Sequence, residues 1–370
     1  MISSVWYIPL LRVPKVAIFI VTFNNESDLP RLLSSLNNLN YKDCEVLFCD
    51  NASTDKSVSI IESFGYKVIK NRENLWFAEA NNQLQKNNPG YDYIFLLNPD
   101  TEIDRDCIDN IIELMESDTE IGISQPLILR LSDKNKINTK GNKLHFGGFG
   151  YVSGDGSSEI PSSITEIGYA SGAALCLRAS AMNSEIFRGH FKAYHEDLDL
   201  SWRVKLAGYK VVLCPSAKVF HKYNFTKGSY KWFLMELNRY KVLLTNYSVC
   251  SLFLLSPYLV FVELVVILQS LKEGWIIQKL KTYFKLLCEL PNLWVERTKI
   301  QSDRVVGDHA IVLSMTDRII FPGEEPSAPL KLFNLISKAY YCLFVRALSF
   351  LSPKFELQKI SKEMEASDKV

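Results

Sequence analysis

Short apolar runs alternate with segments of helical periodicity through the first third of the chain. The apolar runs predict strands at residues 16–21, 45–49, 66–69 and 93–97. The segments between and after them predict helices at residues 27–37, 53–64, 76–87 and 104–115. This alternation favours an α/β fold built on a parallel, doubly wound sheet. No G-x-G-x-x-G motif follows the first strand, so an ordinary dinucleotide-binding fold is disfavoured.

The rhythm changes at residues 132–166, which are rich in Gly, Ser, Asn and Lys. We interpret this stretch as a mobile excursion over the site, with a plain surface loop as the alternative. Beyond it, the pattern predicts a strand at 169–177, a helix at 198–206 and a last strand at 210–213 that ends at Pro215.

The alternation of predicted strands and helices ends after about residue 230. Beyond it, residues 249–268 are nearly all apolar. Twenty such residues suffice to cross a bilayer. The segment contains Glu263, and a carboxylate inside a span costs about 2.5–3.5 kcal/mol. One crossing would also place everything after it on the opposite side of the membrane. The only later apolar segment, 330–351, carries Lys338 and Arg346 and reads as amphipathic.

Three arrangements of this C-terminal region therefore remain open. Helices that lie in the membrane interface are favoured, because lysines that follow the apolar segment suit an anionic headgroup layer. A true span and a soluble helical subdomain are the alternatives. The lysines are Lys272, Lys279, Lys281 and Lys285.

Composition and charge narrow the class of protein. At 370 residues we expect one large domain and an appendage, and 47% hydrophobic content indicates a folded core. A net charge of +1 gives no global attraction to nucleic acid, so no nucleic-acid partner is expected. The eight cysteines lack zinc spacing and are expected to be buried thiols of a reducing compartment. The apolar patch at 5–11 is too short for a signal peptide, so the main domain should face the cytoplasm.

Five polar clusters follow predicted strands or begin a helix, where open α/β sheets bind ligands. Local structure explains part of them, since Ser53 or Thr54 is predicted to cap the second helix. Asp50 stands one residue too early for that role and is better placed to accept hydrogen bonds from a ligand. The clusters are residues 22–26, 50–55, 74–82, 98–100 and 194–199.

The fifth cluster contains adjacent carboxylates, Glu196 and Asp197. Helix capping needs only one carboxylate, whereas neighbouring carboxylates raise each other's pKa and can prepare one as a general base. Asp199 and Arg203 are spaced for a surface ion pair. His221 follows another apolar run and is a candidate metal ligand if it meets Asp100 in space.

In this order, the clusters resemble those of glycosyltransferase family 2, the inverting enzymes of the GT-A fold. The resemblance covers residues 15–230, and the branch it resembles most adds rhamnose or related sugars during surface-polysaccharide assembly. The matching pieces are Val21-Thr-Phe-Asn24, Val46-Leu-Phe-Cys-Asp50-Asn51-Ala-Ser-Thr-Asp55, Asn74-x-x-Phe77-Ala-x-Ala-Asn81-Asn82, Leu97-Asn98-Pro99-Asp100, Ser171-Gly172-Ala173, His195-Glu196-Asp197-Leu-Asp199-x-x-Trp-Arg203 and Val219-Phe-His221.

The resemblance implies a GT-A type sheet, doubly wound, mixed and mostly parallel, with a C-terminal helical membrane-associating region. It divides the chain into an N-terminal extension (1–14), a catalytic domain (15–230) that includes the flexible loop 132–166, and the helical region (231–370). The protein would then act at the cytoplasmic face of a membrane, as a peripheral or monotopic enzyme.

The resemblance also implies roles for individual residues. The segment from Thr22 through Phe23 to Asn24, together with Asp50, would hold the base and ribose of a UDP- or dTDP-sugar. Asn98 and Asp100 would bind a Mg²⁺ or Mn²⁺ ion that bridges the donor's diphosphate, and His221 would complete that site. Asp197, beside Glu196, would take the proton from a hydroxyl of a lipid-linked oligosaccharide or polysaccharide, giving single displacement with inversion. Further donor-site residues are Asn51, Asn74, Phe77 and Asn81, and residues of the acceptor side or its support are Gly172, Ala173, Trp202 and Arg203.

Two positions depart from the family pattern. Asn98 replaces the first Asp of the metal motif, so the site supplies one fewer negative charge and is expected to bind its ion weakly until the donor arrives. Trp76 stands where the family usually has glycine, so its indole must point away from the donor pocket or reshape it. Two other functions were weighed: a catalytically silent sugar-nucleotide-binding scaffold, and a nucleotidyltransferase, which would need a basic glycine-rich phosphate loop that this chain lacks near its first strand.

Overall fold

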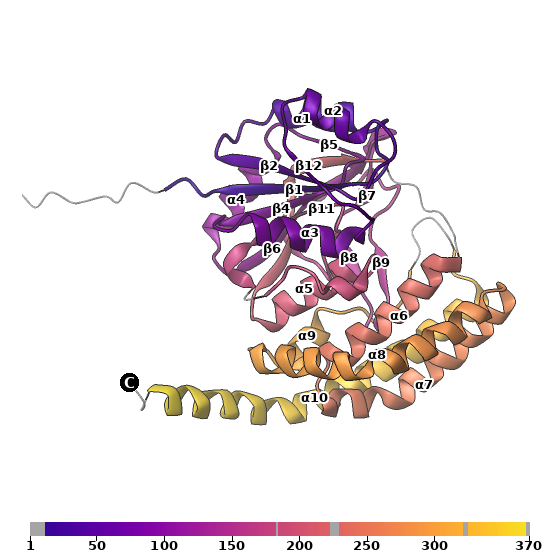
Figure 1. The fold of residues 1–370 in the computed structure, drawn as a ribbon. Coiled ribbons are helices and arrows are strands. Elements are labelled where there is room, and N and C mark those ends of the chain that lie inside the picture. The colour runs from indigo at the N-terminus through magenta and orange to yellow at the C-terminus, as the bar shows by residue number, and fades with distance from the viewer. Residues whose placement is uncertain (1–11, 183, 223–228, 321–324, 368–370) are drawn as a thin grey trace, which may run out of the picture.

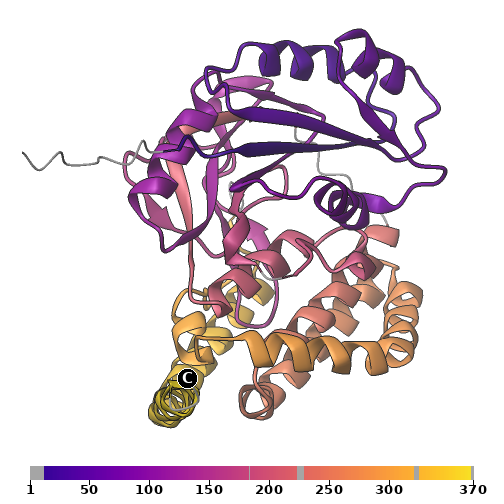
Figure 2. The same cartoon turned by 60° about the vertical axis from the view of Figure 1, so that its left-hand side comes forward.

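The computed structural model describes residues 12–182, 184–222, 229–320 and 325–367, and the apolar patch at 5–11 lies outside them. An α/β domain packs along one side against a layer of long helices (Figures 1 and 2). The strands are β1 Val16–Thr22, β2 Cys44–Asp50, β3 Val68–Lys70, β4 Tyr93–Leu97, β5 Thr101–Ile103, β6 Ile121–Arg130, β7 Asp133–Thr139, β8 Asn142–Leu144, β9 Gly150–Val152, β10 Thr165–Glu166, β11 Ala174–Arg178 and β12 Lys210–His221. The α-helices are α1 Leu29–Asn37, α2 Ser57–Ser63, α3 Trp76–Asn87, α4 Cys107–Ser117, α5 Glu196–Leu206, α6 Ser229–Asn246, α7 Val249–Lys272, α8 Ile276–Asp303, α9 Asp308–Leu313 and α10 Ala328–Ser367.

Among the described residues, one ten-stranded mixed sheet organises the domain. Eight strands follow the order β10-β12-β6-β11-β4-β1-β2-β3, and β5 pairs with β12 and β7 with β6 beside this path. Strands β4, β1, β2 and β3 run parallel, whereas β11 lies antiparallel between β4 and β6. From β1 the chain goes to β2 on one side and later reaches β4 on the other. Open α/β sheets bind ligands at such a reversal, at the carboxyl ends of the strands. The α/β fold class with a C-terminal helical region is confirmed.

Apolar side chains cover both faces of the sheet. Helices α1, α2 and α4 pack on one face, and α3 and α5 pack on the other. A third apolar cluster joins α5 to α6, α7, α9 and α10. Within it, the rings of Trp202 and Tyr247 meet edge to face with centroids 4.8 Å apart. The helical layer and the α/β domain therefore share a core.

The interpretation of residues 132–166 as a mobile excursion or plain loop is wrong. Strands β7, β8, β9 and β10 lie in this stretch, and β7 extends the sheet beside β6. The buried His145 bonds Ser337 of α10 through its Nε2 at 2.8 Å. A Cβ added at Gly148 would lie 3.0 Å from side-chain carbons of Arg239 and Leu243 in α6. At this position, a glycine allows close helix packing rather than chain mobility.

Three local expectations also differ from the structure. Strand β6 was not predicted, because Ser124, Gln125 and Pro126 interrupt its apolar pattern. Strand β12 continues past Pro215, since an irregularity in its pairing with β6 between Cys214 and Lys218 accommodates the proline. Helix α2 begins at Ser57, so the predicted cap at residues 53–54 is wrong.

The long apolar helix α7 lies against the protein along one stripe. It is the one described helix that is long and apolar enough to cross a membrane. Its inward stripe includes Leu255, Tyr258 and Val262. Glu263 accepts charged partners from neighbouring helices, with Lys279 Nζ at 2.8 Å and an Arg239 guanidinium nitrogen at 3.4 Å. The helix therefore keeps its carboxylate paired with the protein.

The opposite side of the helical layer exposes large apolar side chains from three helices. On α7 they include Phe253, which is 77% exposed. Exposed apolar side chains also occur on α8 and α10, which lie with α7 at the lower side of the molecule in Figure 1. These exposed side chains are Phe253, Val260, Leu264, Leu268 and Leu271 on α7; Ile277, Leu280, Phe284, Leu287, Leu290, Trp294 and Val295 on α8; and Leu332, Leu335, Leu343 and Phe350 on α10. We call this set the apolar layer.

The cysteines are free thiols throughout the chain. Cys49, Cys107, Cys176 and Cys214 are buried inside the α/β domain, as expected. Three others, Cys250, Cys288 and Cys342, are exposed on α7, α8 and α10, which corrects the expectation of buried thiols for the helical region.

Candidate active site

A tightly bonded polar turn follows β2. Asp50 is almost fully buried, and its carboxylate accepts hydrogen bonds from Thr22 Oγ1 at 3.0 Å and from the Ser53 amide at 2.9 Å and hydroxyl at 2.5 Å. These bonds make Asp50 an organiser of the turn at residues 51–55. Asp50 does not cap α2, which begins at Ser57, in agreement with the expectation that it stands too early for that role.

The loop after β1 is bonded to that turn. Asn24 adopts a left-handed conformation with φ of 57°, and its Oδ1 accepts the Thr54 amide at 2.8 Å. The Asn24 amide donates to Ser53 Oγ at 2.9 Å. Phe23, the residue between the two anchored positions, keeps 47% of its surface exposed. The carboxyl ends of β1 and β2 thus form one rigid platform with an exposed aromatic ring.

A third loop, before α3, is held by two asparagines. Asn51 Nδ2 donates to the carbonyl of Trp76 at 3.1 Å, and Asn74 Oδ1 accepts the Trp76 amide at 2.8 Å. Trp76 has a φ of 65°, a conformation that glycine adopts freely and a bulky side chain rarely does. Its indole turns toward α6, with its centroid 5.9 Å from the ring of Tyr230.

Asp100 and His221 meet, although 120 residues lie between them in the chain. The antiparallel pairing of β5 with β12 sets Thr101 opposite His221, which leaves Asp100 Oδ1 3.3 Å from His221 Nε2. His221 Nδ1 lies 3.0 Å from Asn138 Oδ1. When Nδ1 carries the proton, Nε2 and the Asp100 oxygen are two facing acceptors, and a cation between them would satisfy both.

This donor set fits a divalent cation. Asp100 Oδ1 is buried without a hydrogen-bond partner, and Asn98 stands two residues away. Carboxylate and amide oxygens with an imidazole nitrogen suit Mn²⁺ or Mg²⁺. Within the described ranges, no group of three or more His, Cys, Asp or Glu side chains is gathered to hold a metal. The protein therefore offers a partial coordination shell.

The adjacent carboxylates begin α5 and lie close to this site. Asp197 Oδ2 accepts the Gly172 amide at 3.0 Å, and Oδ1 accepts the Leu198 amide at 2.8 Å. The neighbour of Gly172, Ala173, accepts a hydrogen bond from the Asn98 amide at 2.9 Å. A Cβ added at Gly172 would lie 3.5 Å from Asp197. The short run Gly172–Ala173 thus places Asp197 beside the Asn98–Asp100 turn.

Burial sets the protonation of this pair. Desolvation, and then the charge of Asp197, raise the pKa of Glu196 well above its ordinary value, and Glu196 Oε2 has no hydrogen-bond partner. Burial also raises the pKa of Asp197, but the amides of Gly172 and Leu198 oppose that rise. We infer that Glu196 holds the proton and that Asp197 is the carboxylate of the pair.

The raised pKa of Glu196 predicts a stability effect. The ordinary value of 4.5 applies to the unfolded chain, so ionisation above it penalises only the folded state. The contribution of Glu196 to the free energy of unfolding is therefore fully present below pH 4.5. It is lost as the pH rises through the higher pKa of Glu196 in the folded protein. We expect the Tm of Glu196→Gln, relative to wild type, to increase with pH above 4.5. A Tm difference that does not grow with pH, or that matches the exposed control Glu159→Gln, would contradict the assignment.

A strained loop leads into the adjacent carboxylates Glu196 and Asp197. Lys192, Tyr194 and His195 have φ values of 60°, 68° and 66°. Asn238 of α6 is fully buried, and its amide nitrogen donates to three carbonyls at residues 191–194, at distances of 2.7–3.1 Å. The helical layer therefore holds the loop that positions the carboxylates. Sequence reasoning missed Asn238, because nothing local distinguishes it from other helix asparagines.

Asp199 and Arg203 form the predicted ion pair, with Nε to Oδ2 at 2.8 Å. The pair is buried rather than on the surface, because Arg188 and Asn246 enclose Asp199 as well. Although burial opposes it, the charges of Arg188 and Arg203 lower the pKa of Asp199. Arg203 thus supports α5 from behind, and the sequence analysis did not identify Arg188.

Two other candidate residues occupy core positions. Trp202 is fully buried against Tyr247. The amide of Asn81 donates to the carbonyl of Phe77 in its own helix at 2.9 Å, and the side chain is almost completely buried. Phe77 itself lies at the site, with Cε1 3.5 Å from a Cβ added at Gly172.

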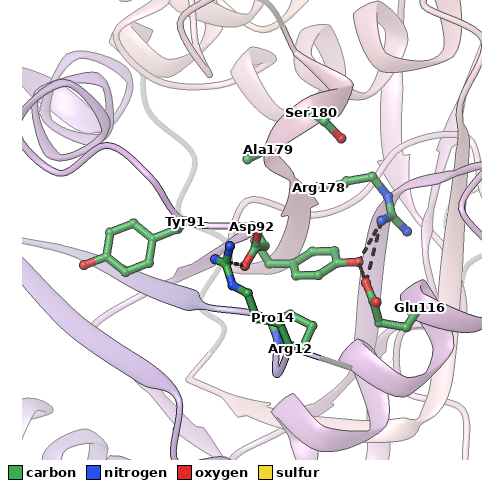
Figure 3. A pocket seen from close by; sticks show the side chains of 9 residues that line it. Arg12, Pro14, Tyr91, Asp92, Glu116, Arg178, Ala179 and Ser180 are labelled. Atoms are coloured by element: carbon green, nitrogen blue, oxygen red, sulfur yellow. Dashed lines mark hydrogen bonds and ion pairs between the residues drawn. The ribbon is translucent and has the colours of Figure 1, made fainter. Parts of the chain in front are cut away.

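A cavity of about 310 Å³ lies at the opposite edge of the sheet, near the start of β4 (Figure 3). Arg178 is fully engaged there, bonding Tyr93 Oη at 2.7 Å and the carbonyl of Ile121 at 2.9 Å. Its guanidinium therefore fixes β11 to α4 and β6 and is not offered to a ligand. The lining residues are Arg12, Pro14, Tyr91, Asp92, Tyr93, Glu116, Arg178, Ala179 and Ser180.

Comparison with known families agrees with this geometry. The family described as "Glycosyl transferase family group 2" matches residues 93–290, more than half of the chain, and "Glycosyl transferase family 2" matches residues 17–162. The chain belongs to the family 2 glycosyltransferases and is a glycosyltransferase.

Individual relatives are distant. Poly-beta-1,6-N-acetyl-D-glucosamine synthase of Staphylococcus aureus is 26% identical over 211 residues, which cover 54% of this chain and 48% of that protein. The chain thus spans about half the length of the curated relatives it matches. The crystal structure of GalNAc-T7 with UDP, GalNAc and Mn²⁺ has a similar fold, with 13% identity, a TM-score of 0.52 and coverage of 64% of this chain and 48% of that one. S. aureus TarS 1-349 in complex with UDP aligns with 14% identity over 90% of this chain and 91% of that chain, with a TM-score of 0.48.

Proposed function

We propose that this glycosyltransferase moves a sugar from a nucleotide-diphosphate donor to a hydroxyl of a lipid-linked or surface-polysaccharide acceptor, with inversion. One observation carries the proposal: the Asp100–His221 pair and the Asp197 carboxylate lie at the same edge of the sheet, joined through Gly172–Ala173. The reaction needs a cation beside the departing diphosphate and a base beside the attacking hydroxyl, on either side of one sugar carbon.

The donor binds at the platform formed by the loops after β1 and β2 and the loop before α3. Exposed Phe23 offers a face for the base. The turn organised by Asp50 and the internal hydrogen bonds of Asn24 and Asn51 hold the surrounding loops in place. UDP- and dTDP-sugars, rhamnose among them, are the proposed donors. The UDP of the GalNAc-T7 structure supports a uridine donor by analogy of fold.

Asp100 and His221, with the amide oxygen of Asn98, would hold a Mg²⁺ or Mn²⁺ ion, and donor phosphate oxygens would fill the remaining positions. When bound, the cation neutralises the charge of the departing diphosphate. Asn98 contributes no charge, so the donor itself is needed to complete the shell. The Mn²⁺ in the GalNAc-T7 structure supports this choice of ion.

Asp197 takes the proton of the acceptor hydroxyl as that oxygen attacks the anomeric carbon. The Gly172 and Leu198 amides hold its two oxygens in place and keep it ionised beside the protonated Glu196. A single attack from the face opposite the diphosphate inverts the configuration. Because Asn238 of α6 holds the loop at residues 191–194, the base is positioned before the acceptor arrives.

The apolar layer supports a monotopic position on the membrane, at the cytoplasmic face. A span formed by α7 would remove Leu255, Tyr258 and Val262 from the shared core and separate Glu263 from Lys279. Helices that lie flat keep those contacts and cover the exposed face with lipid. Relatives that make poly-beta-1,6-N-acetyl-D-glucosamine support a surface-polysaccharide acceptor.

A panel of nucleotide sugars tests the proposal. We expect one donor to release nucleoside diphosphate when Mn²⁺ or Mg²⁺ is present, and we expect chelation to abolish the release. Asp100→Ala should lower it by about 10²-fold or more, because a metal ligand is lost, whereas the exposed control Asp43→Ala should not. Release of pyrophosphate instead would indicate a nucleotidyltransferase, and donor binding without release would indicate a silent scaffold.

A further inference from the structure

We propose that Trp76, Lys192 and Tyr230, with Tyr194 and Lys231, form an acceptor subsite for a sugar that carries a neighbouring phosphate group. The proposal rests on the proposed function, since it places the acceptor of that reaction. We call these five residues the acceptor rim. They come from three segments far apart in the chain: the start of α3, the loop before α5 and the start of α6.

Aromatic rings form one side of the rim. The rings of Trp76 and Tyr230 lie with centroids 5.9 Å apart and planes inclined at 39°, and Phe233 stacks on Tyr230 at 5.9 Å. Tyr230 is 48% exposed and Tyr194 is 39% exposed. Half-exposed aromatic faces with polar edges are suited to pack against the apolar face of a sugar ring, whose hydroxyls remain in water.

Two ammonium groups lie on these rings. Lys192 Nζ is 5.5 Å from the centre of the Trp76 ring, and Lys231 Nζ is 5.0 Å from the centre of the Tyr194 ring. In the described part of the chain, no carboxylate forms a salt bridge with Lys192, which is an exposed residue. A lysine held near a ring without a carboxylate partner is available to bind phosphate as a point charge.

The rim is built on strained backbone. Trp76, Lys192 and Tyr194 all have positive φ values, of 65°, 60° and 68°. Such strain persists where surrounding contacts impose it, typically at ligand clamps. Here the Ala78 amide donates to the Lys192 carbonyl at 3.2 Å, and Asn238 holds the rest of the loop. Both sides of the rim are therefore fixed relative to each other.

The rim lies next to the base. Phe77, which follows Trp76, and Asp197, three residues after Tyr194, approach the same point at Gly172 within 3.5 Å. A hydroxyl of a sugar seated on Trp76 can therefore reach Asp197, and a phosphate on that sugar can reach Lys192. The Asn51 amide donates to the Trp76 carbonyl, which ties the rim to the donor platform.

The test uses the full-length protein saturated with UDP and Mn²⁺, which occupies the donor site. Binding of N-acetylglucosamine 1-phosphate and of neutral methyl N-acetylglucosaminide is measured by NMR titration. We expect the phosphorylated probe to bind at least about fivefold tighter, and Lys192→Gln to remove that preference. Trp76→Gly should weaken both probes by about five- to tenfold, while its backbone strain is relieved because glycine adopts this φ freely.

Matched controls are Trp294→Ala, an exposed tryptophan on α8, and Lys67→Ala, an exposed lysine at the far edge of the sheet; both should bind like wild type. A methyl phosphodiester of the probe models a phosphodiester polymer, and a methyl diphosphate ester models a lipid-linked sugar. Tighter binding of either one identifies the source of the phosphate. Equal binding of all probes to wild type and variants, or no binding, overturns the subsite.

Failure of the subsite and failure of the proposed function are distinguishable in the same preparations. If wild type releases nucleoside diphosphate from a donor, the enzyme assignment stands whatever the probes show. If no donor is turned over by wild type, the proposed function fails instead.

Discussion

Replacing Asp197 by Asn should abolish sugar transfer and leave nucleotide binding nearly unchanged. The amide keeps the shape of the side chain but cannot accept a proton, and general bases contribute about 10²–10⁴-fold to such reactions. The hydrogen bond from the Gly172 amide at 3.0 Å can be kept by the amide oxygen, so α5 should begin as before. We expect kcat to fall by about 10³-fold, measured as transfer to acceptor.

Affinity for UDP in the presence of Mn²⁺ gives the accompanying control, and it should stay within about threefold of wild type. The exposed substitution Asp43→Asn, at the end of β2 opposite Asp50, provides a charge-matched variant away from the site. A large loss of UDP affinity in Asp197→Asn would assign Asp197 to donor or metal binding instead. Retained transfer would remove it from the mechanism.

Charged substitutions on the apolar layer should detach the protein from membranes. Phe253, Leu268 and Phe284 are 77%, 66% and 72% exposed, so aspartate at these positions disturbs little protein packing. Burying a large apolar side chain in lipid stabilises the bound state by about 1.5–3 kcal/mol. Losing three such contacts should therefore reduce binding to vesicles of zwitterionic and anionic phospholipid by well over tenfold.

Two controls separate an interfacial position from a span. Phe64→Asp with Ile164→Asp, both exposed in the α/β domain, should leave vesicle binding unchanged. Alkaline carbonate should release the wild-type protein from membranes if the helices lie flat. Retention after that wash would indicate that α7 spans the bilayer, and undiminished vesicle binding of the triple variant would show that another surface binds lipid.

The first four strands were predictable because each is a compact apolar run between helical segments, and the pattern repeats locally. Strand β6 was not, since Ser124, Gln125 and Pro126 have the composition of a turn. They are buried in a strand because β11 and β12 pair with β6 on both sides. The glycine-rich composition of residues 132–166 likewise gave no sign that Gly148 is needed for contact with α6.

The candidate site likewise contains residues that local sequence identifies and contacts that only the tertiary structure creates. Motif spacing was enough to select Asp100, Asp197 and His221, since each follows or begins a regular element. That Asp100 meets His221 depends on the β5–β12 pairing, which brings together residues that are distant in the chain. The burial that makes Asp199 a structural residue comes from Arg188 and Asn246, and neither has a local signal.

The chain's own order of residues determined the strand–helix alternation, the polar groups at the strand ends and the apolar character of its last third. These properties follow from side-chain chemistry within a few positions. Tertiary structure alone decided which carboxylate keeps its proton, which face of α7 is exposed and which residues surround Trp76. Desolvation, pairing and packing depend on neighbours brought from elsewhere in the chain, and local spacing carries no information about them.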